Sequence, residues 1–366
     1  MRKQTKLVAV LSTAALLAIG ASMTSFAATG WAEEDGTWVY YNRDGERATE
    51  SWKKSGNSWY WLDENGEMAI DQLDNEDAGE DDEPDHYWYY FQANGKALKN
   101  GDNSKVVLKT INGKKYAFDD EGKMLYGWVS SDNAERIDNT DDDAFKDGVY
   151  YFGGEDDGAM TTGWLLIDVS YDEATNDDDD QTRWFYFKSN GKKIYADNGE
   201  RTKDKTINGK KYAFDEYGAM VAEWSLDEDD EKKASDTEAQ EAASTASTSE
   251  AWEGNGKYAK YTQAWKYYNS VEDGSRVSKG WFKVVPAEML NKEKYNDDED
   301  HWYYADGSGN LYAGEFKTIK GKKYAFRNDG RMLTGLKFIK EGDEDFADVK
   351  ADDDDNRPFD NEDDFF

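Results

Sequence analysis

The sequence predicts an all-β protein made of repeated β-hairpins that stack into a solenoid, with acidic loop insertions that have room for short helices. The first observation is a decapeptide that occurs unchanged at Lys109–Phe118 and Lys205–Phe214, and again at Lys317–Phe326 with Lys320 in place of the asparagine. Each copy continues through a Gly-containing turn to a methionine, at Met124, Met220 and Met332. The second observation is that runs of alternating aromatic residues also precede such turns elsewhere in the chain. Self-similarity at this short period is typical of stacked small units.

Each repeat unit reads as one hairpin. Alternating aromatic and polar residues followed by a Gly-containing turn are a hairpin signal, and the Asn112-Gly113 pair inside the decapeptide is a favoured two-residue turn. An isolated hairpin is marginally stable in water, so each unit must pack against its neighbours. Ten units are expected between Gly30 and about Ile339. Besides the three decapeptide units, they begin near Gly30, Ser51, His86, Gly148, Arg183, Ala264 and His301.

Aligning the units on the turn glycine separates two faces of the aromatic strand, because side chains alternate along a strand. One face stays largely apolar in the units and is the predicted packing face; its members include Val39, Tyr60, Tyr89, Tyr116, Phe118 and Phe185. The other face varies. It carries Trp59 and Trp61 in one unit but Lys115 and Ala117 in a decapeptide unit. A face that can lose its aromatics is a better candidate for ligand contact than for core, so the decapeptide units are interpreted as scaffold.

The remaining segments set the domain boundaries. Residues 1–27 read as a secretory signal peptide, with a basic start, an apolar run and small residues at the cleavage site. Residues 28–226 and 257–340 hold the repeats, with a helical turn expected near Pro286–Lys294. Between them, 227–256 is a linker rich in Ala, Ser, Thr and acids, and 341–366 is an acidic tail. No apolar segment after the leader predicts a membrane span.

Charge and composition narrow the function. The formal net charge is −34, and −37 without the three basic residues of the leader, which argues against nucleic acid and anionic membranes as partners. Cysteine is absent and there are two His, leaving little for transition-metal sites, although the acidic loops could bind Ca²⁺ loosely. No ordered set of nucleophile, base and acid appears, and the carboxylates fall in presumed loops. The sequence therefore predicts a protein that is not an enzyme and needs no cofactor.

The units resemble the cell wall-binding repeats of Gram-positive surface proteins, the choline-binding repeats among them. The KTINGKKYAF units with their G-x-M turns are also similar to the C-terminal repeats of clostridial toxins and glucan-binding proteins. The resemblance implies a secreted protein associated with the cell wall or cell surface. It also implies binding to a cell-wall polymer, either choline-bearing teichoic acid or a glycan.

In choline-binding relatives, the resemblance implies aromatic cages formed between neighbouring hairpins. Carried over by position, the fullest candidate cages are Trp31 with Trp38 and Trp61, and Trp52 with Trp59 and Tyr90. The pairs Trp164 with Trp184 and Trp281 with Trp302 would face Ala213 and Ala325, so they lack a third ring and are separated by long insertions.

Other uses of these residues stay open at this point. The tryptophans could simply pack between units, or they could stack on sugar rings. The whole chain could be an adhesin-like module that binds a host glycan or protein, or a structural spacer.

Overall fold

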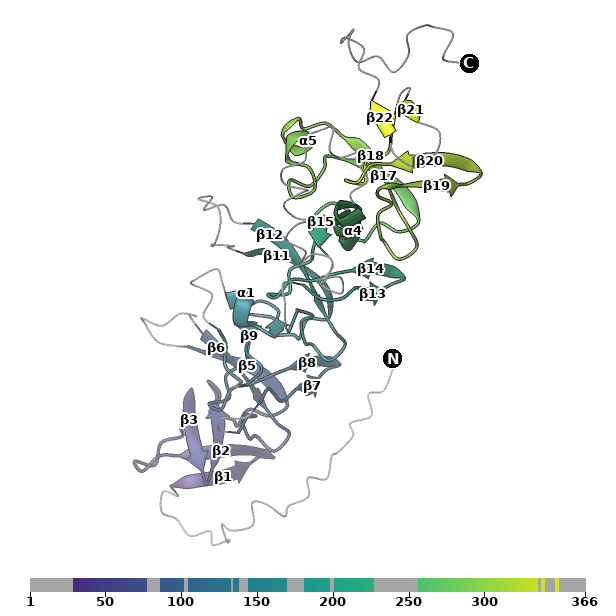
Figure 1. Cartoon of the computed structure of the whole chain (residues 1–366). Helices are drawn as coiled ribbons and strands as arrows, with labels where there is room; N and C mark the ends of the chain where they lie inside the picture. The colour runs from purple at the N-terminus through teal and green to yellow at the C-terminus, as the bar shows by residue number, and fades with distance from the viewer. Residues whose placement is uncertain are drawn as a thin grey trace, which may run out of the picture. The chain divides into compact units, whose positions relative to one another are not determined.

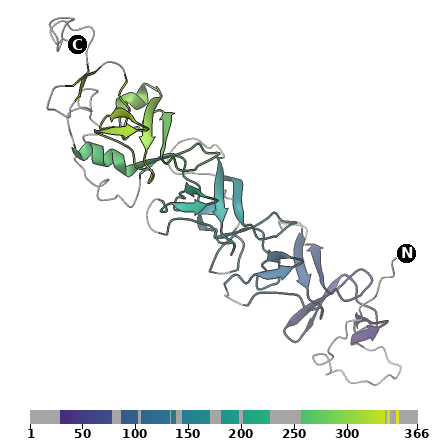
Figure 2. The same cartoon turned by 90° about the vertical axis from the view of Figure 1, so that its right-hand side faces the viewer.

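The computed structural model describes residues 29–77, 86–101, 105–132, 134–137, 144–169, 181–197, 201–226, 256–334, 337–339 and 346–348 (Figures 1 and 2). The predicted signal peptide lies outside these residues, as do nearly all of the predicted linker and most of the acidic tail. The chain divides into two compact units, one of residues 1–103 and 118–124 and one of residues 104–117 and 125–366.

The described strands form eleven two-stranded antiparallel sheets, which confirms the predicted hairpin-repeat architecture. The first ten correspond to the ten predicted units. They are β1 (Gly30–Glu34) with β2 (Thr37–Tyr41), β3 (Ser51–Ser55) with β4 (Ser58–Leu62), β5 (Gln72–Asp77) with β6 (His86–Phe91), β7 (Lys109–Ile111) with β8 (Lys114–Tyr116), β9 (Gly127–Val129) with β10 (Tyr150–Phe152), β11 (Gly163–Val169) with β12 (Gln181–Phe187), β13 (Lys205–Ile207) with β14 (Lys210–Tyr212), β15 (Glu223–Leu226) with β16 (Trp265–Tyr268), β17 (Gly280–Val284) with β18 (His301–Ala305), and β19 (Glu315–Ile319) with β20 (Lys322–Phe326). The eleventh, β21 (Lys337–Ile339) with β22 (Phe346–Asp348), extends into the segment expected to be an acidic tail.

In several repeat units, an aspartate side chain closes the turn that follows the aromatic strand. The Asp215 carboxylate accepts the backbone N–H groups of Tyr217 and Ala219 at 2.9 and 2.8 Å, an Asx-type turn. The following glycine, Gly218, has φ +91°, and a Cβ there would lie 2.8 Å from the backbone oxygen of Ile194 in the preceding repeat unit. Glycine is therefore required both for the turn and for the close approach of neighbouring repeat units.

A backbone hydrogen bond joins successive repeat units. Just after the turn, one residue pairs with the end of its own aromatic strand, as Met220 does with Phe214. The N–H of Met220 also donates to the carbonyl oxygen of Trp184 in the preceding repeat unit at 2.8 Å. We call this the bridging residue. Equivalent bridging bonds are Met68 to Trp38, Ala97 to Trp59, Met124 to Trp88, Met160 to Lys115, Lys193 to Val149, Arg276 to Lys211 and Met332 to Trp302.

The cores form where the predicted packing faces meet the next repeat unit. Val39 and Phe185 have no exposed surface, and Tyr60, Tyr89 and Tyr116 are at most 9% exposed. This confirms the assignment of the packing face.

Short helices lie in the insertions. α1 (Ala144–Asp147) lies between β9 and β10, α4 (Gly256–Ala264) precedes β16, and α5 (Lys292–Asn296) lies between β17 and β18 (Figure 1). The helix expected near Pro286–Lys294 begins later than predicted, because the Asn291 side chain accepts the N–H of Lys294 and caps α5 at that point.

Candidate ligand-binding cages

Three pairs of tryptophans meet edge to face with nearly the same geometry. The ring centroids of Trp52 and Trp59 are 6.4 Å apart at an interplanar angle of 89°. The pair Trp164 and Trp184 has 6.2 Å and 88°. The pair Trp281 and Trp302 has 6.3 Å and 88°. Such agreement between three separate hairpins means that the repeat itself sets the arrangement.

The hairpin register explains why these rings meet. Trp164 on β11 is paired with Tyr186 on β12, and Trp184 lies two residues earlier on β12, so it projects to the same face of the strand. Trp52 is paired with Trp61, and Trp281 with Tyr304, in the same way. The long insertions do not separate the tryptophans, because the inserted residues lie at the far end of the hairpin and leave the pairing around the tryptophans unchanged.

A tyrosine of the next repeat unit forms the third wall. Tyr89, Tyr212 and Tyr324 each have a ring centroid 4.8 Å from the first tryptophan of the preceding repeat unit. Their interplanar angles are 70°, 66° and 64°. We call the three groups the Trp52 cage, the Trp164 cage and the Trp281 cage. Each cage thus joins two repeat units through three differently oriented rings.

The third ring differs from the sequence prediction by one residue. Trp52 meets Tyr89, whereas Tyr90 is paired with Leu73 in its own hairpin and donates its hydroxyl to Asp71 at 3.3 Å. Likewise Trp164 meets Tyr212, whereas the prediction placed Ala213 opposite it. A shift of one residue along a strand changes the face, so the third ring comes from the packing face.

Two of the three tyrosines belong to the repeated decapeptide. Tyr212 and Tyr324 stand within the second and third copies, so these units contribute rings to the candidate cages in addition to the packing predicted for them. The signal that could have revealed them is the constancy of this tyrosine column. The column was assigned only to core, although one edge of such a ring can also face a ligand.

Two of the cages open into pockets. The pocket of the Trp52 cage has a volume of about 430 Å³ and is also lined by Lys99, Asp120 and Glu121. The pocket of the Trp164 cage has a volume of about 190 Å³ and is also lined by Met220, Glu272 and Asp273. Trp59 and Trp302 are 39% and 41% exposed, so a ligand can reach their ring faces.

The family model described as the choline-binding repeat matches residues 28–72, the segment that holds β1 to β4 and the first two rings of the Trp52 cage. This segment carries the choline-binding repeat. The chain is also similar to glucosyltransferase-S of Streptococcus mutans, with 24% identity over 73% of this chain and 12% of that protein. The chain therefore spans about an eighth of the length of that relative.

Two similar solved structures come from Streptococcus pneumoniae. Choline binding protein F has 16% identity over 90% of this chain and 96% of that chain, with a TM-score of 0.46. The modular autolysin LytC, in complex with a synthetic peptidoglycan ligand, has 19% identity over 84% of this chain and 48% of that chain, with a TM-score of 0.40.

The aromatic rings of the first repeat unit are grouped differently from the prediction, which placed Trp61 with Trp31 and Trp38. The Trp31 ring lies 5.3 Å from Tyr40 and 5.1 Å from Tyr60, and Trp38 packs against the same cluster. Trp61 belongs to the neighbouring cluster with Trp52. The structure thus brings Trp31 and Trp38 together with Tyr60, the residue equivalent to Tyr89.

The repeat at Trp128 is closed. Trp128 is 3% exposed, and Phe145 of α1 packs in the same cluster. The Lys193 ammonium lies over the Trp128 ring, 5.0 Å from its centroid, and donates to the backbone oxygen of Phe145. Burial lowers the pKa of Lys193 to about 7, although Asp215 and Asp147 oppose this shift. Because Lys193 is the bridging residue equivalent to Met220, this repeat supplies its own cation to the aromatic face.

The repeat at Trp224 is covered in another way. Its third ring, Tyr303, lies 5.0 Å from Trp224, but Trp265 meets Tyr261 of α4 at 6.2 Å. Tyr261 and Leu290 are buried in the same cluster. α4 and the segment before α5 therefore occupy the side on which a ligand would approach.

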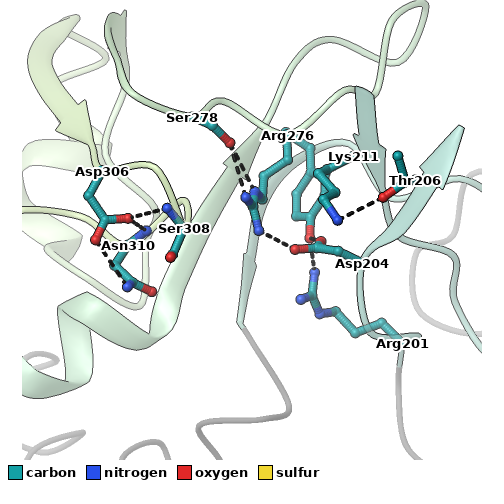
Figure 3. Close-up of polar contacts among 10 residues, drawn as sticks. Arg201, Asp204, Thr206, Lys211, Arg276, Ser278, Asp306, Ser308 and Asn310 are labelled. Atoms are coloured by element: carbon teal, nitrogen blue, oxygen red, sulfur yellow. Dashed lines mark hydrogen bonds and ion pairs between the residues drawn. The ribbon is translucent and has the colours of Figure 1, made fainter. Parts of the chain in front are cut away.

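Polar side chains replace the cage at Thr206 (Figure 3). Asp204 and Lys211 stand at the positions of Trp164 and Trp184, and the Lys211 ammonium donates to the Thr206 hydroxyl at 2.7 Å. The bridging residue is Arg276, which forms an ion pair with Asp204 and donates to the Ser278 hydroxyl. The Tyr268 hydroxyl donates to Asp204 at 2.6 Å. The polar side chains of this site bond to one another, and neither tryptophan position of the cage holds an aromatic ring.

The described residues hold no group of three or more His, Asp or Glu side chains placed to bind a metal ion. The acidic runs in which loose Ca²⁺ binding was expected lie largely outside these residues. Among the described helices, none has the length and apolar character needed to cross a membrane.

Proposed function

We propose that the chain attaches non-covalently to a cell-wall polymer by binding choline groups in the Trp52, Trp164 and Trp281 cages. The observation that carries this proposal is the threefold recurrence of two perpendicular tryptophans with a tyrosine of the next repeat unit at 4.8 Å. Aromatic faces attract a quaternary ammonium through their quadrupole, with about 0.5–2 kcal/mol per contact depending on desolvation.

The proposed ligand source is a choline-bearing teichoic acid of a Gram-positive cell wall, and the proposed location is the cell surface. A polymer that repeats its choline groups can engage several cages of one chain, so weak individual sites combine into firm attachment. We propose that the chain itself is a binding module and not an enzyme.

A glycan is the alternative ligand, because the flat tryptophan faces can also stack on sugar rings. At the pocket of the Trp164 cage, Glu272 and Asp273 favour a cation over a neutral sugar. At the pocket of the Trp52 cage, the two acidic residues outnumber the one lysine, Lys99. Binding of a host glycan or protein, or a spacer role, would leave the cages empty in a choline titration.

Calorimetric titration of the full chain with choline tests the proposal. Wild-type protein should bind choline, and Trp59→Ala, Trp184→Ala and Trp302→Ala should each remove one site. The matched control is Trp88→Ala, because Trp88 occupies the same strand position in a repeat unit that has Leu73 where the first cage tryptophan would stand. Absence of choline binding, or an equal loss in the control, would contradict the proposal.

A pull-down on purified cell walls tests the polymer. A chain with a net charge of −34 is repelled by a phosphate-rich polymer, so attachment should strengthen when salt or Ca²⁺ screens the charge. Weaker attachment on addition of Ca²⁺ would count against teichoic acid as the partner.

A further inference from the structure

Two cages carry an acidic pair at the rim of the pocket. Asp120 and Glu121 line the pocket of the Trp52 cage, and Glu272 and Asp273 line that of the Trp164 cage. Each pair directly precedes a turn glycine, Gly122 or Gly274. That glycine belongs to the repeat unit two places after the one that carries the tryptophans of the cage. The same element of the repeat therefore provides a fourth wall in two separate places.

The two acidic residues of each pair have different surroundings. The second residue is neutralised by a lysine: Glu121 lies 2.9 Å from the Lys123 ammonium, and Asp273 lies 2.9 Å from the Lys210 ammonium. The first residue, Asp120 or Glu272, forms no ion pair with any of the described residues. A hydrogen bond with the Ser270 hydroxyl holds the pKa of Glu272 below its usual value, which favours the ionised form.

We propose that Asp120 and Glu272 are specificity-determining residues that act as counter-ions for a ligand cation held by the rings of the Trp52 and Trp164 cages. This inference rests on the proposed function and deepens it. Three aromatic walls attract a cation but also accept a neutral ligand of the same shape. A carboxylate at the rim stabilises only the charged ligand, so removing that charge should reduce the discrimination between the charged and the neutral ligand.

The closed repeat at Trp128 provides a matched control. Glu216 stands two residues before Gly218, the position that Asp120 and Glu272 occupy before their own glycines. The Trp128 face of that repeat is buried and already holds the Lys193 ammonium. Glu216→Gln therefore changes the same turn position by the same chemistry in a repeat whose tryptophan face is covered.

The test uses the full chain with Trp59→Ala and Trp302→Ala, so that the Trp164 cage remains as the reporting site. Choline and its neutral isostere 3,3-dimethylbutan-1-ol are titrated by calorimetry against this background, with and without Glu272→Gln. The Glu272→Gln change should weaken choline binding roughly fivefold, the effect of one charge pair near water, and leave binding of the isostere unchanged. Glu216→Gln should change neither. Asp120→Asn, tested in a Trp184→Ala and Trp302→Ala background, should behave as Glu272→Gln does.

The outcomes separate the two proposals. If the background protein binds neither choline nor the isostere, while the wild type also binds neither, the proposed function fails. If choline binds but Glu272→Gln leaves its affinity unchanged, or weakens choline and the isostere equally, the counter-ion role is overturned. Rising salt should weaken choline binding to the Trp164 cage and have less effect on the Glu272→Gln protein.

Discussion

The Trp164 cage and the Trp128 repeat are two versions of the same frame. In both, the first tryptophan follows a glycine at the start of its strand, is paired with a tyrosine, and meets an aromatic ring of the next repeat unit about 5 Å away. They differ at three positions. The position of the second ring holds Trp184 in one and Val149 in the other, and the third ring is Tyr212 in one and Phe185 in the other. The bridging residue is Met220 in one and Lys193 in the other.

This difference shows that the fold by itself does not leave the aromatic face open. The packing face and the bridging hydrogen bond are present in both repeats. Access to the aromatic face depends on the residue at the second ring position, on the side chain of the bridging residue and on whether an insertion such as α1 covers the face. The Thr206 site, with bridging residue Arg276, follows the same rule.

The largest expected difference concerns stability. Trp128→Ala should lower the free energy of unfolding by about 3–5 kcal/mol, because it removes a fully packed ring and leaves a cavity. Trp164→Ala should cost less, because Trp164 is only half-buried, but it should abolish choline binding at that cage. Urea unfolding followed by circular dichroism compares the two variants. Equal destabilisation would show that the Trp164 cage is core.

The third ring offers the next test. Tyr212→Leu should weaken choline binding by about 0.5–2 kcal/mol, since one cation–π contact is lost. Phe185→Leu changes the equivalent ring at Trp128 and should leave choline binding unchanged. Calorimetric titration distinguishes the two. A loss of choline binding in the Phe185 variant would mean that the closed repeat is also a ligand site.

The buried lysine should give the closed repeat a pH signature. The pKa of Lys193 is lowered from 10.5 to about 7, so the unfolded chain binds more protons than the folded chain between these values. Stability should therefore rise with pH from about 7 to about 10.5 relative to Lys193→Met, which copies the Met220 arrangement. Urea midpoints measured across this range for both proteins test this. Parallel curves would contradict a buried, chargeable Lys193.

The smallest effect is expected at the rim lysines of the decapeptides. Lys114 and Lys210 form equivalent exposed ion pairs with Asp157 and Asp273. Neither Lys114→Ala nor Lys210→Ala should change stability measurably, because exposed pairs contribute little. Lys210→Ala frees the Asp273 carboxylate beside the Trp164 cage and should strengthen choline binding slightly. Lys114→Ala is its control and should leave the affinity unchanged.

The sequence predicted the hairpins well because their signals are local. Alternating aromatics and turn glycines located ten units, and the constant face identified the core. The third ring was misplaced by one residue, because the register between repeat units depends on the bridging hydrogen bond, which has no sequence signature. The role of Lys193 was not predicted, since nothing in an isolated lysine indicates that it turns inward under α1. The length of the insertions also suggested that Trp164 and Trp184 lie apart. The structure keeps them together, because β11 and β12 continue as paired strands.

The bridging bond has a mechanical consequence. The backbone oxygen of Trp184 accepts a hydrogen bond from the N–H of Met220. The main chain of a tryptophan proposed to contact the ligand is therefore bonded to the following repeat unit. Trp164 meets Tyr212 of that same unit. A cation seated between these rings would oppose the peeling of one repeat unit from the next. A chain bound to its polymer should therefore resist mechanical unfolding better than a free chain, because each occupied cage adds contacts between two neighbouring repeat units.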